Sequence, residues 1–439
     1  MYDLIRPAKI EQIDSEEPVV DKTSTNNLAF YHGSTAKPLS TPWQVSLERA
    51  KKLITYELPE GYIVDCACGS GVQLAAYASL ARKPAVGIEL DASRAFASAK
   101  NLEVVANLRK NLDHNWFNES IFLVGDGRKG REVLQTIHQQ NEQESEPKVG
   151  LLILDPARPR NSRTHGLEEM SPQLPEVFSG WKDFLSHGKN GPAIILDLSP
   201  RLVHEQRLEV ESIVDEYWPG IGKTWEWVSR GGGRVDRLTL WLGAVADQKF
   251  KRRFVRLPSN PKNKPTVIQA EKPLSAGENT PAVARRLPRK GDYLSIIDSA
   301  LVESGLAQEW LESCLDENAL SKITDPDHAK PYWSDVRTRR PLFHHPVELK
   351  LPYGGENFIQ AGGKIVAIFH EEFSLENSDK IVAFARKHEI GNLKIRLPID
   401  PSIQPKLQGA IDRQLSSTGG KRKGFMVKSG SDSMSLLVV

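Results

Sequence analysis

The feature that most constrains the fold is a regular alternation of short apolar runs and helical patterns between residues 61 and 200. The apolar runs read YIVDCA, AVGIEL, SIFLVGD, GLLILDPA and PAIILDLS. Between them, apolar residues recur at helical spacing, and we expect helices over residues 72–81, 92–112, 131–139 and 174–185. Strands that alternate with helices pair in parallel, and the helices cover both faces of the sheet. The alternation therefore predicts an α/β fold built on a parallel sheet.

The sequence after this region predicts an antiparallel hairpin. The runs TWEWVSR and RLTLWLGAV flank three successive glycines at 231–233, which is typical of two strands joined by a turn. We expect this pair at the edge of the sheet, so that the α/β domain spans residues 41–246. Its first helix begins at Thr41–Pro42, because proline is favoured in the first turn. Residues 1–40 form an N-terminal extension.

The rest of the chain predicts a further, smaller part. A chain of 439 residues exceeds one average domain of roughly 100 to 200 residues. Residues 249–300 hold twelve Lys and Arg against four Asp and Glu, and we assign 247–345 to a basic connecting region with short strands and helices. The runs KIVAIFH, NLKIRLPI, GFMVKS and SLLVV read as strands. We assign residues 346–439 to a small α+β domain.

Composition narrows the class of protein. Hydrophobic residues make up 39% of the chain and charged residues 26%, as in ordinary globular proteins. No apolar run approaches the roughly 20 residues of a membrane-spanning helix, and the N-terminus lacks a hydrophobic signal core. We therefore expect a cytoplasmic protein with no membrane partner.

Cysteine and histidine are too few and too unfavourably spaced to predict a metal centre. The chain has three cysteines, and Cys66 and Cys68 are separated by one residue, so they predict neither a disulfide framework nor a four-ligand zinc site. The adjacent His344 and His345 point in different directions, and no further ligand spacing completes a site. We expect no metal, and we interpret the cysteines as small packing residues.

The most informative stretch runs from Val64 to Gly71, where a strand enters a glycine turn and then a helix. Glycines in the turn let the backbone approach a ligand closely, and the helix that follows presents unpaired amides. Four successive predicted strands also end in an acid, namely Asp65, Glu89, Asp126 and Asp155. Because carboxyl ends of strands in an open α/β sheet face the ligand crevice, these acids predict one binding site.

Two of these acids are placed to bind an adenosyl group. Glu89 can accept both ribose hydroxyls, and Asp126, between Gly125 and Gly127, can accept a hydrogen bond from the adenine amino group. Each acid alone is equally consistent with a helix cap or a solvated strand end. A dinucleotide-binding oxidoreductase would carry a third glycine where Leu74 stands.

Residues 61–245 resemble class I S-adenosylmethionine-dependent methyltransferases, because a glycine loop, an acidic ribose ligand, an adenine-side Asp and a D-P-x-x motif follow in order. The segments TPWQVSLERA, DPARPR, TWEWVS and LTLWLGA, together with the tail from Asn392, resemble methyltransferases with a C-terminal THUMP-like domain. This resemblance implies a Rossmann-like seven-stranded methyltransferase sheet with an antiparallel edge hairpin, and S-adenosyl-L-methionine as cofactor. Ala67 replaces the usual glycine, and Asp197 stands where the fifth strand often presents Lys.

The resemblance also implies site residues. The cofactor-binding residues are Asp65, Cys66, Ala67, Gly69, Gly71, Glu89, Leu90, Asp126, Gly127 and Asp155, and the catalytic residues are Asp155, Pro156 and Arg158. In relatives that methylate exocyclic amines, the Asp side chain and the Pro carbonyl accept hydrogen bonds from the amine, and an aromatic residue stacks on the base. Here Arg158 takes the aromatic position, where it can stack on a base, contact phosphate or pair with Asp155. No cysteine is near this motif to serve the covalent route to carbon-5 pyrimidine methylation.

Basic clusters outside the α/β core favour nucleic acid as a partner. They are Lys249–Arg256, Arg285–Arg286, Arg289–Lys290, Arg337, Arg339–Arg340 and Lys421–Lys423. Such side chains can follow a phosphate backbone, although each cluster alone is also typical of a solvated face. We expect a methyltransferase that acts on a base nitrogen of structured RNA, such as rRNA or tRNA. A catalytically inactive RNA-binding protein that retains this fold and a small-molecule methyltransferase are the alternatives.

Overall fold

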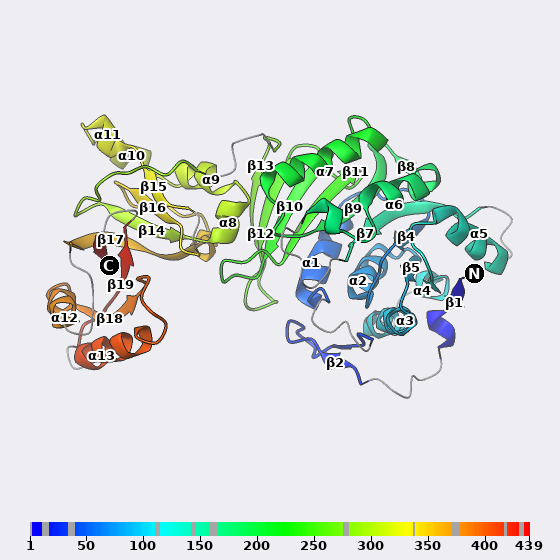
Figure 1. Ribbon diagram of the computed structural model, residues 1–439, viewed down its shortest axis with the longest axis horizontal. Helices are drawn as coiled ribbons and strands as arrows, with labels where there is room; N and C mark the ends of the chain where they lie inside the picture. The colour runs from blue at the N-terminus through cyan, green and yellow to red at the C-terminus, as the bar shows by residue number, and fades with distance from the viewer. Residues whose placement is uncertain are drawn as a thin grey trace. The chain divides into compact units, whose positions relative to one another are not determined.

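The computed structural model describes residues 2–10, 17–33, 40–109, 115–141, 146–157, 166–274, 281–336, 339–370, 378–416, 419–429 and 434–439. The chain forms two compact units (Figure 1). The first unit contains Met1–Arg230 and Val235–Ala276, and the second contains Gly231–Arg234 and Gly277–Val439. This division differs from the expected one, because the first unit continues past residue 246 and residues 346–439 are not a unit of their own.

Within the described residues, the first unit is built on an 11-stranded sheet with the order β1-β6-β5-β4-β7-β9-β11-β10-β12-β13, and β8 pairs with β9. Its strands are β1 (Asp3–Ile5), β4 (Tyr62–Asp65), β5 (Ala85–Glu89), β6 (Ile121–Val124), β7 (Val149–Leu154), β8 (His187–Gly188), β9 (Gly191–Leu198), β10 (Lys223–Ser229), β11 (Arg237–Gly243), β12 (Arg252–Arg256) and β13 (Thr266–Ala270). A separate pair is formed by β2 (Val19–Val20) and β3 (Ala29–Phe30). The chain passes from β4 to β5 and β6 on one side, then to β7 and β9 on the other. All five of these strands are parallel, which confirms the α/β class.

Helices cover both faces of this sheet, as the alternation predicts. They are α1 (Trp43–Leu53), α2 (Val72–Ala81), α3 (Ala92–Ala106), α4 (Asn115–Asn118), α5 (Gly130–Asn141), α6 (Leu174–Trp181) and α7 (His204–Tyr217). Figure 1 shows α1, α2 and α3 on one face and α6 and α7 on the other. The residues of α2 are buried from Val72 to Ser79 because α1 and α3 flank it while it packs on the sheet. A helix buried on all sides needs this apolar, alanine-rich sequence.

The predicted hairpin forms, but its expected place at the sheet edge is wrong. Strand β11 pairs with β9 as well as β10, and β12 then pairs in parallel with β10. The basic segment after residue 246 therefore adds β12 and β13 to the sheet. This addition covers the backbone groups that β10 would otherwise expose as an open edge.

The second unit is a smaller α+β body. Its sheet has the order β15-β16-β14-β17-β20-β19-β18, so strands from either side of residue 345 share one sheet. The strands are β14 (Tyr293–Ile297), β15 (Tyr332–Asp335), β16 (Leu342–His345), β17 (Ile359–Phe369), β18 (Ile390–Ile395), β19 (Arg422–Lys428) and β20 (Ser435–Val438). The helices are α8 (Ser299–Glu303), α9 (Ala307–Ser313), α10 (Glu317–Leu320), α11 (Pro326–Ala329), α12 (Ser378–Lys387) and α13 (Gln404–Ser416).

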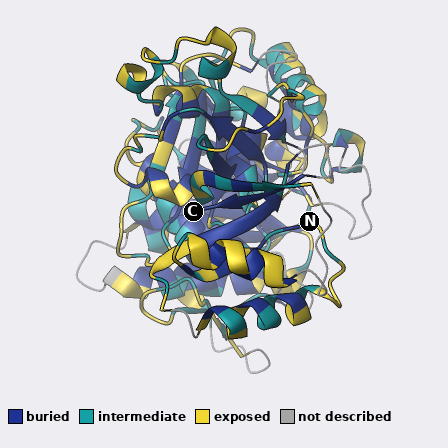
Figure 2. Ribbon diagram, turned by 90° about the vertical axis from the view of Figure 1, so that its left-hand side faces the viewer, coloured by how far each residue is buried: buried dark blue, intermediate teal, exposed yellow. Residues whose placement is uncertain are grey.

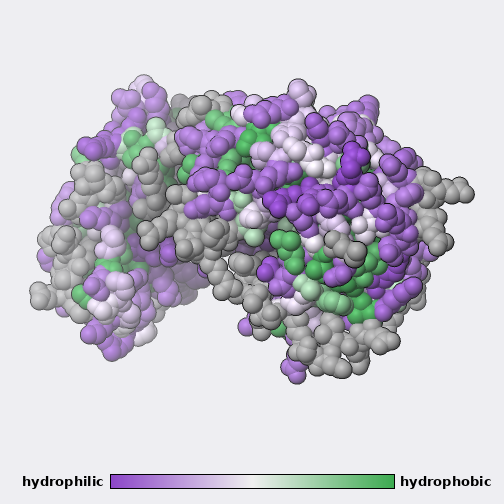
Figure 3. Space-filling model, turned by 45° about the vertical axis from the view of Figure 1, so that its right-hand side comes forward, coloured by the Kyte–Doolittle hydropathy of each residue, from purple (hydrophilic) through white to green (hydrophobic). Residues whose placement is uncertain are grey.

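The strands are more buried than the helices that cover them. In Figure 2 the strands are mostly dark blue, whereas the helices carry yellow and teal outer faces. On the face of the first unit seen in Figure 3, hydrophobic side chains gather in a patch surrounded by hydrophilic ones. Among the described residues, no helix combines the length and the apolar character needed to cross a membrane.

Candidate functional site

A cavity of about 830 Å³ opens at the carboxyl ends of β4, β5, β6, β7 and β9. The strand order reverses between β4 and β7, which is where open α/β sheets bind ligands. The cavity is lined by all the residues predicted to bind a cofactor, namely Asp65, Cys66, Ala67, Gly69, Gly71, Glu89, Leu90, Asp126, Gly127 and Asp155. Pro156 lines it as well. Arg158 lies outside the described residues, and its role stays a prediction.

The glycine loop is held in a shape that only small residues allow. Gly71 has a φ of +65°, and a Cβ atom there would lie 1.8 Å from the Ser98 hydroxyl oxygen on α3. Gly69 also has a positive φ, but a Cβ there would meet no atom within 4 Å, so this backbone faces open cavity. Ala67 is not among the residues with positive φ. Its departure from glycine therefore costs no backbone strain.

Glu89 joins the end of β5 to this loop. Its carboxylate accepts hydrogen bonds from the Gly69 N–H at 3.0 Å and from the Asp91 N–H at 3.2 Å. The Arg94 guanidinium lies 3.7 Å away. An ionised carboxylate offers about four lone-pair positions, so Glu89 retains capacity to accept hydrogen bonds from a ligand in the cavity.

Asp126 lies at one end of the row of acids, because β6 is next to β5 on the side away from β4. Arg128 donates to both of its carboxylate oxygens, at 2.9 and 2.8 Å. This hydrogen bonding lowers the pKa of Asp126 below its ordinary value. Tyr2, next to β1, donates its hydroxyl to the Asp126 carbonyl at 2.8 Å. Asp126 is thus fixed in position, and its lowered pKa keeps it ionised and able to accept hydrogen bonds.

Asp65 lies deepest in the row. Burial raises the pKa of Asp65 well above its ordinary value, and the nearby carboxylates of Asp155, Asp197 and Glu89 raise it further. A hydrogen bond from the Ala67 N–H at 3.1 Å acts in the opposite direction. Several acids crowded at one rim repel each other, and a cationic ligand among them relieves that repulsion.

Asp155, at the end of β7, forms an ion pair that the sequence did not reveal. Its carboxylate lies 3.1 Å from the guanidinium of Arg237 on β11, and Arg237 also donates to the Thr41 hydroxyl. Both Arg237 and Thr41 line the cavity. No local motif marks Arg237, because strand pairing alone brings it beside β9.

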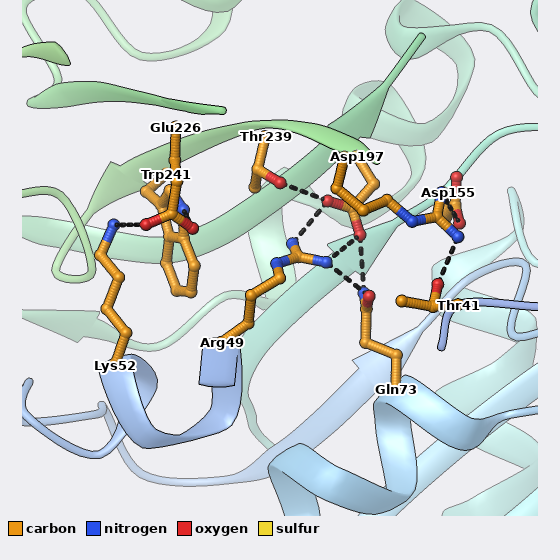
Figure 4. A network of polar contacts seen from close by, with 10 residues as sticks. Thr41, Arg49, Lys52, Gln73, Asp155, Asp197, Glu226, Thr239 and Trp241 are labelled. Atoms are coloured by element: carbon orange, nitrogen blue, oxygen red, sulfur yellow. Dashed lines mark hydrogen bonds and ion pairs between the residues drawn. The ribbon is translucent and has the colours of Figure 1, made fainter. Parts of the chain in front are cut away.

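Asp197 does not line the cavity but anchors α1 and α2 to the sheet (Figure 4). Its buried carboxylate accepts from Arg49 at 2.5 and 2.9 Å, from Gln73 at 2.6 Å and from Thr239 at 2.7 Å. Burial alone would raise the pKa of Asp197, but Arg49 and Arg237 hold it below its ordinary value. Asp197, at the end of the fifth parallel strand, therefore holds α1 and α2 on the sheet.

The cysteines and the paired histidines are buried. Burial raises the pKa of Cys66 and Cys68 well above the ordinary thiol value, so both are protonated thiols. In the second unit, burial lowers the pKa of His344 to about 3 and that of His345 to about 4. Their Nε2 atoms lie 2.9 and 3.0 Å from serine hydroxyls. In the part of the chain that the structure describes, no group of three or more His, Cys, Asp or Glu side chains could hold a metal ion.

The predicted basic clusters differ in their surroundings. In β12, Arg252 and Arg256 are buried and Arg253 lies 2.9 Å from Glu226, so this cluster holds the strand in the sheet. In the second unit, Arg289 lies 3.3 Å from Asp325. Five other exposed residues of these clusters and their neighbourhood form no ion pair with a described acid, namely Lys290, Lys387, Lys421, Arg422 and Lys423. Burial and the nearby charges of Lys290, Lys387 and Arg422 lower the pKa of His388.

No protein-family model and no curated protein matches the sequence. Among solved structures, the chain is similar to precorrin-6y C5,15-methyltransferase from Geobacter metallireducens, with 14% identity over 52% of this chain and 98% of that chain and a TM-score of 0.32. It is also similar to human methyltransferase-like protein 13 in complex with SAH, with 14% identity over 48% of this chain and 81% of that chain and a TM-score of 0.27. A third similar structure is ribosomal protein L11 methylase from Lactobacillus delbrueckii subsp. bulgaricus, with 13% identity over 46% and 75% and a TM-score of 0.26. Similarities at this level carry no argument about activity, and the fold class rests on the strand order described above.

Proposed function

We propose that the protein is an S-adenosylmethionine-dependent methyltransferase. The observation that carries this proposal is the cavity at the switch point of the sheet, where a glycine loop faces a row of carboxylates on four successive parallel strands. Its volume of about 830 Å³ lies in the range of ligand sites, roughly 300 to 1,000 Å³. S-adenosylmethionine carries a sulfonium and an ammonium group, and both favour a site crowded with carboxylates.

The residues present fit this cofactor. The backbone at Gly69 faces open cavity, where a larger side chain would fill the space next to the loop. In this proposal Glu89 accepts the ribose hydroxyls, Asp126 accepts from the adenine amino group, and Asp65 with Gly69 and Gly71 borders the methionine part. When bound, S-adenosylmethionine supplies an electrophilic methyl group, and methyl transfer is an in-line displacement that needs no metal.

Asp155 and Pro156 would hold the acceptor. The Arg237 guanidinium at 3.1 Å keeps the Asp155 carboxylate oriented at the cavity, where an acceptor nitrogen can donate a hydrogen bond to it. The Pro156 carbonyl would accept a hydrogen bond from the second N–H of the same amine. Holding the nitrogen in line with the methyl group is the main task of these residues.

The acceptor in this proposal is a base in structured RNA, and the second unit contributes to binding it. The support is the group of exposed cations around His388, which has no acidic partner in the described residues. Cations without acidic partners attract phosphate and release its counterions. A small-molecule methyltransferase would have no use for such a surface.

The test is to incubate the full chain with methyl-labelled donor and total RNA from its source, and to digest the product to nucleosides. Label in a modified base is the expected result. Asp155→Ala should lower turnover by about 100-fold or more, because removing one preorganised hydrogen-bonding group at a reacting centre costs about 100 to 1,000-fold, while calorimetry shows unchanged affinity for S-adenosylhomocysteine. Asp215→Ala is the matched control, because Asp215 on α7 pairs with Lys223 and does not line the cavity. Label transferred at the wild-type rate by Asp155→Ala would refute the acceptor role, and donor binding without any transfer to RNA would favour an inactive RNA-binding protein.

A further inference from the structure

Two described stretches that precede β4, residues 29–33 and 40–41, contact the elements around the cavity, and we call them the N-terminal segment. Phe30, in β3, is buried and packs against Trp43 of α1, with ring centres 5.6 Å apart. Farther along the chain, Ser40 and Thr41 line the cavity itself. The segment therefore approaches the site from a part of the sequence that carries no recognisable motif.

Asn101 of α3 connects this segment to the glycine loop. Its side chain is fully buried and makes three hydrogen bonds. The Oδ1 atom accepts from the Tyr31 N–H at 2.8 Å, and the Nδ2 group donates to the Tyr31 carbonyl and to the Ser70 carbonyl, each at 2.7 Å. One amide thus holds the backbone of the N-terminal segment and the backbone of the loop at the same time.

Two further contacts surround this connection. The hydroxyl oxygens of Ser40 and Ser70 lie 3.1 Å apart, so the segment contacts the loop a second time. Gly33 has a φ of +71°, and a Cβ atom there would lie 2.9 Å from Cγ of Arg94. Arg94 lines the cavity and lies 3.7 Å from the Glu89 carboxylate. The segment therefore contacts the glycine loop and closely approaches Arg94, the partner of the acid expected at the ribose.

We propose that Tyr31, Gly33, Ser40 and Thr41 belong to the methyl-donor site, and that Asn101 is the positioning residue that couples them to the glycine loop. This inference rests on the proposed function, since it concerns the ligand of that same cavity. Movement of Tyr31 away from α3 removes two of the bonds that hold Asn101, and Asn101 in turn fixes Ser70 between Gly69 and Gly71. Coupling of this kind is reciprocal, so donor binding must strengthen the anchorage of the segment as much as the anchorage strengthens donor binding.

The test measures affinity and backbone exchange on the full chain, with S-adenosylhomocysteine as the probe. Calorimetry on Asn101→Ala should give about tenfold weaker binding, because the variant loses several buried hydrogen bonds at the loop. Hydrogen–deuterium exchange of the peptide spanning residues 24–33 should slow when the probe is added to the wild type and should no longer respond to it in Asn101→Ala. Glu103→Ala is the matched control, because Glu103 lies on the same helix and pairs only with Lys100 among the described residues.

The outcomes separate this inference from the proposed function. If the wild type does not bind S-adenosylhomocysteine, both the proposed methyl-donor site and this inference are wrong. Two results would overturn only the coupling, provided that the wild type binds the probe. One is equal affinity of Asn101→Ala and the wild type, and the other is exchange of residues 24–33 in the wild type that does not change when the probe is added. If Asn101→Ala fails to fold, Ser40→Ala and the wild-type exchange experiment decide the question. Ser40→Ala should weaken probe binding by a few fold.

Discussion

At the scale of single residues, Glu89 carries two functions with one carboxylate. It already accepts hydrogen bonds from the loop at Gly69 and from Asp91, and we expect it to accept the ribose hydroxyls as well. Hydrogen bonds to a charged acceptor contribute about 1.5 to 3 kcal/mol each. Loss of this carboxylate should therefore weaken ligand binding both directly and through the loop that Glu89 holds.

Glu89→Ala is expected to weaken binding of S-adenosylhomocysteine by about 100-fold, as the loss of roughly 3 kcal/mol requires. Isothermal calorimetry measures the affinity, and circular dichroism checks that the fold is retained. Glu60→Ala is a suitable control, because the Glu60 side chain is 84% exposed and pairs with Lys148 away from the cavity. Equal affinities for Glu89→Ala and wild type would rule out the ribose assignment.

At the scale of elements, the strand, glycine turn and helix from Val64 to Ala81 could be predicted because their signal is local. The apolar run, Gly69 and Gly71 lie within a few positions of one another, and α2 has the expected bounds. The acids at the carboxyl ends of the strands follow from the same alternation, because parallel pairing brings those ends together.

Interactions between distant elements could not be predicted in this way. Arg49 and Asp197 are 148 positions apart, and no spacing rule connects a helix residue to the end of a strand at that separation. The same holds for Arg237 and Asp155. The pairing of β12 with β10 could not be predicted because three of the five residues of β12 are arginines, yet the Arg252 and Arg256 side chains are buried in the folded unit.

The attachment of α1 to the sheet gives stability a pH dependence. The Lys52 ammonium group lies 3.1 Å from the Glu226 carboxylate and 4.1 Å from the centre of the Trp241 ring (Figure 4). Burial lowers the pKa of Lys52 from 10.5 to about 8, against the attraction of Glu226 and with the help of the Arg253 and Arg49 charges. Between these two values the unfolded chain holds a proton that the folded chain has lost. The free energy of unfolding therefore rises with pH from about 8 to 10.5, and below about 8 the buried charge lowers stability by a constant amount.

Lys52→Met should remove this rise. We expect the difference in unfolding free energy between the variant and the wild type to change by at most about 3 kcal/mol across that window, as measured by urea unfolding followed through tryptophan fluorescence. Lys51→Met is the matched control, because Lys51 is the adjacent residue on α1 and its side chain is 52% exposed. If the unfolding free energies of the wild type and Lys52→Met differed by the same amount at every pH, the lowered pKa of Lys52 would be contradicted.

At the scale of the whole molecule, the two units differ in how their basic residues are paired with acids. The net charge of the chain is only +2, so a general attraction to nucleic acid is not expected from the total. The cations of the first unit at β12 are buried or paired with Glu226, whereas those around His388 in the second unit have no described acidic partner. Phosphate contacts of an RNA substrate should therefore be concentrated on the second unit.

This expectation can be measured through the salt dependence of RNA binding. Each phosphate neutralised contributes about 0.7 to 0.9 to the slope of log K against log salt, for single strands and duplexes respectively. The triple substitution Lys387→Gln, Arg422→Gln and Lys423→Gln should thus reduce the slope by about 2 if all three residues contact phosphate. Lys129→Gln, Lys148→Gln and Lys51→Gln in the first unit provide a control with the same change in total charge.

Three outcomes are distinguishable. An equal loss of slope in both variants would assign the effect to net charge alone. An unchanged slope in the first variant would exclude the second unit's cations from the RNA contact. A reduced slope confined to the first variant, with affinity for S-adenosylhomocysteine unchanged, would place RNA binding on one unit and donor binding on the other, because the substituted side chains are not among those that line the donor cavity.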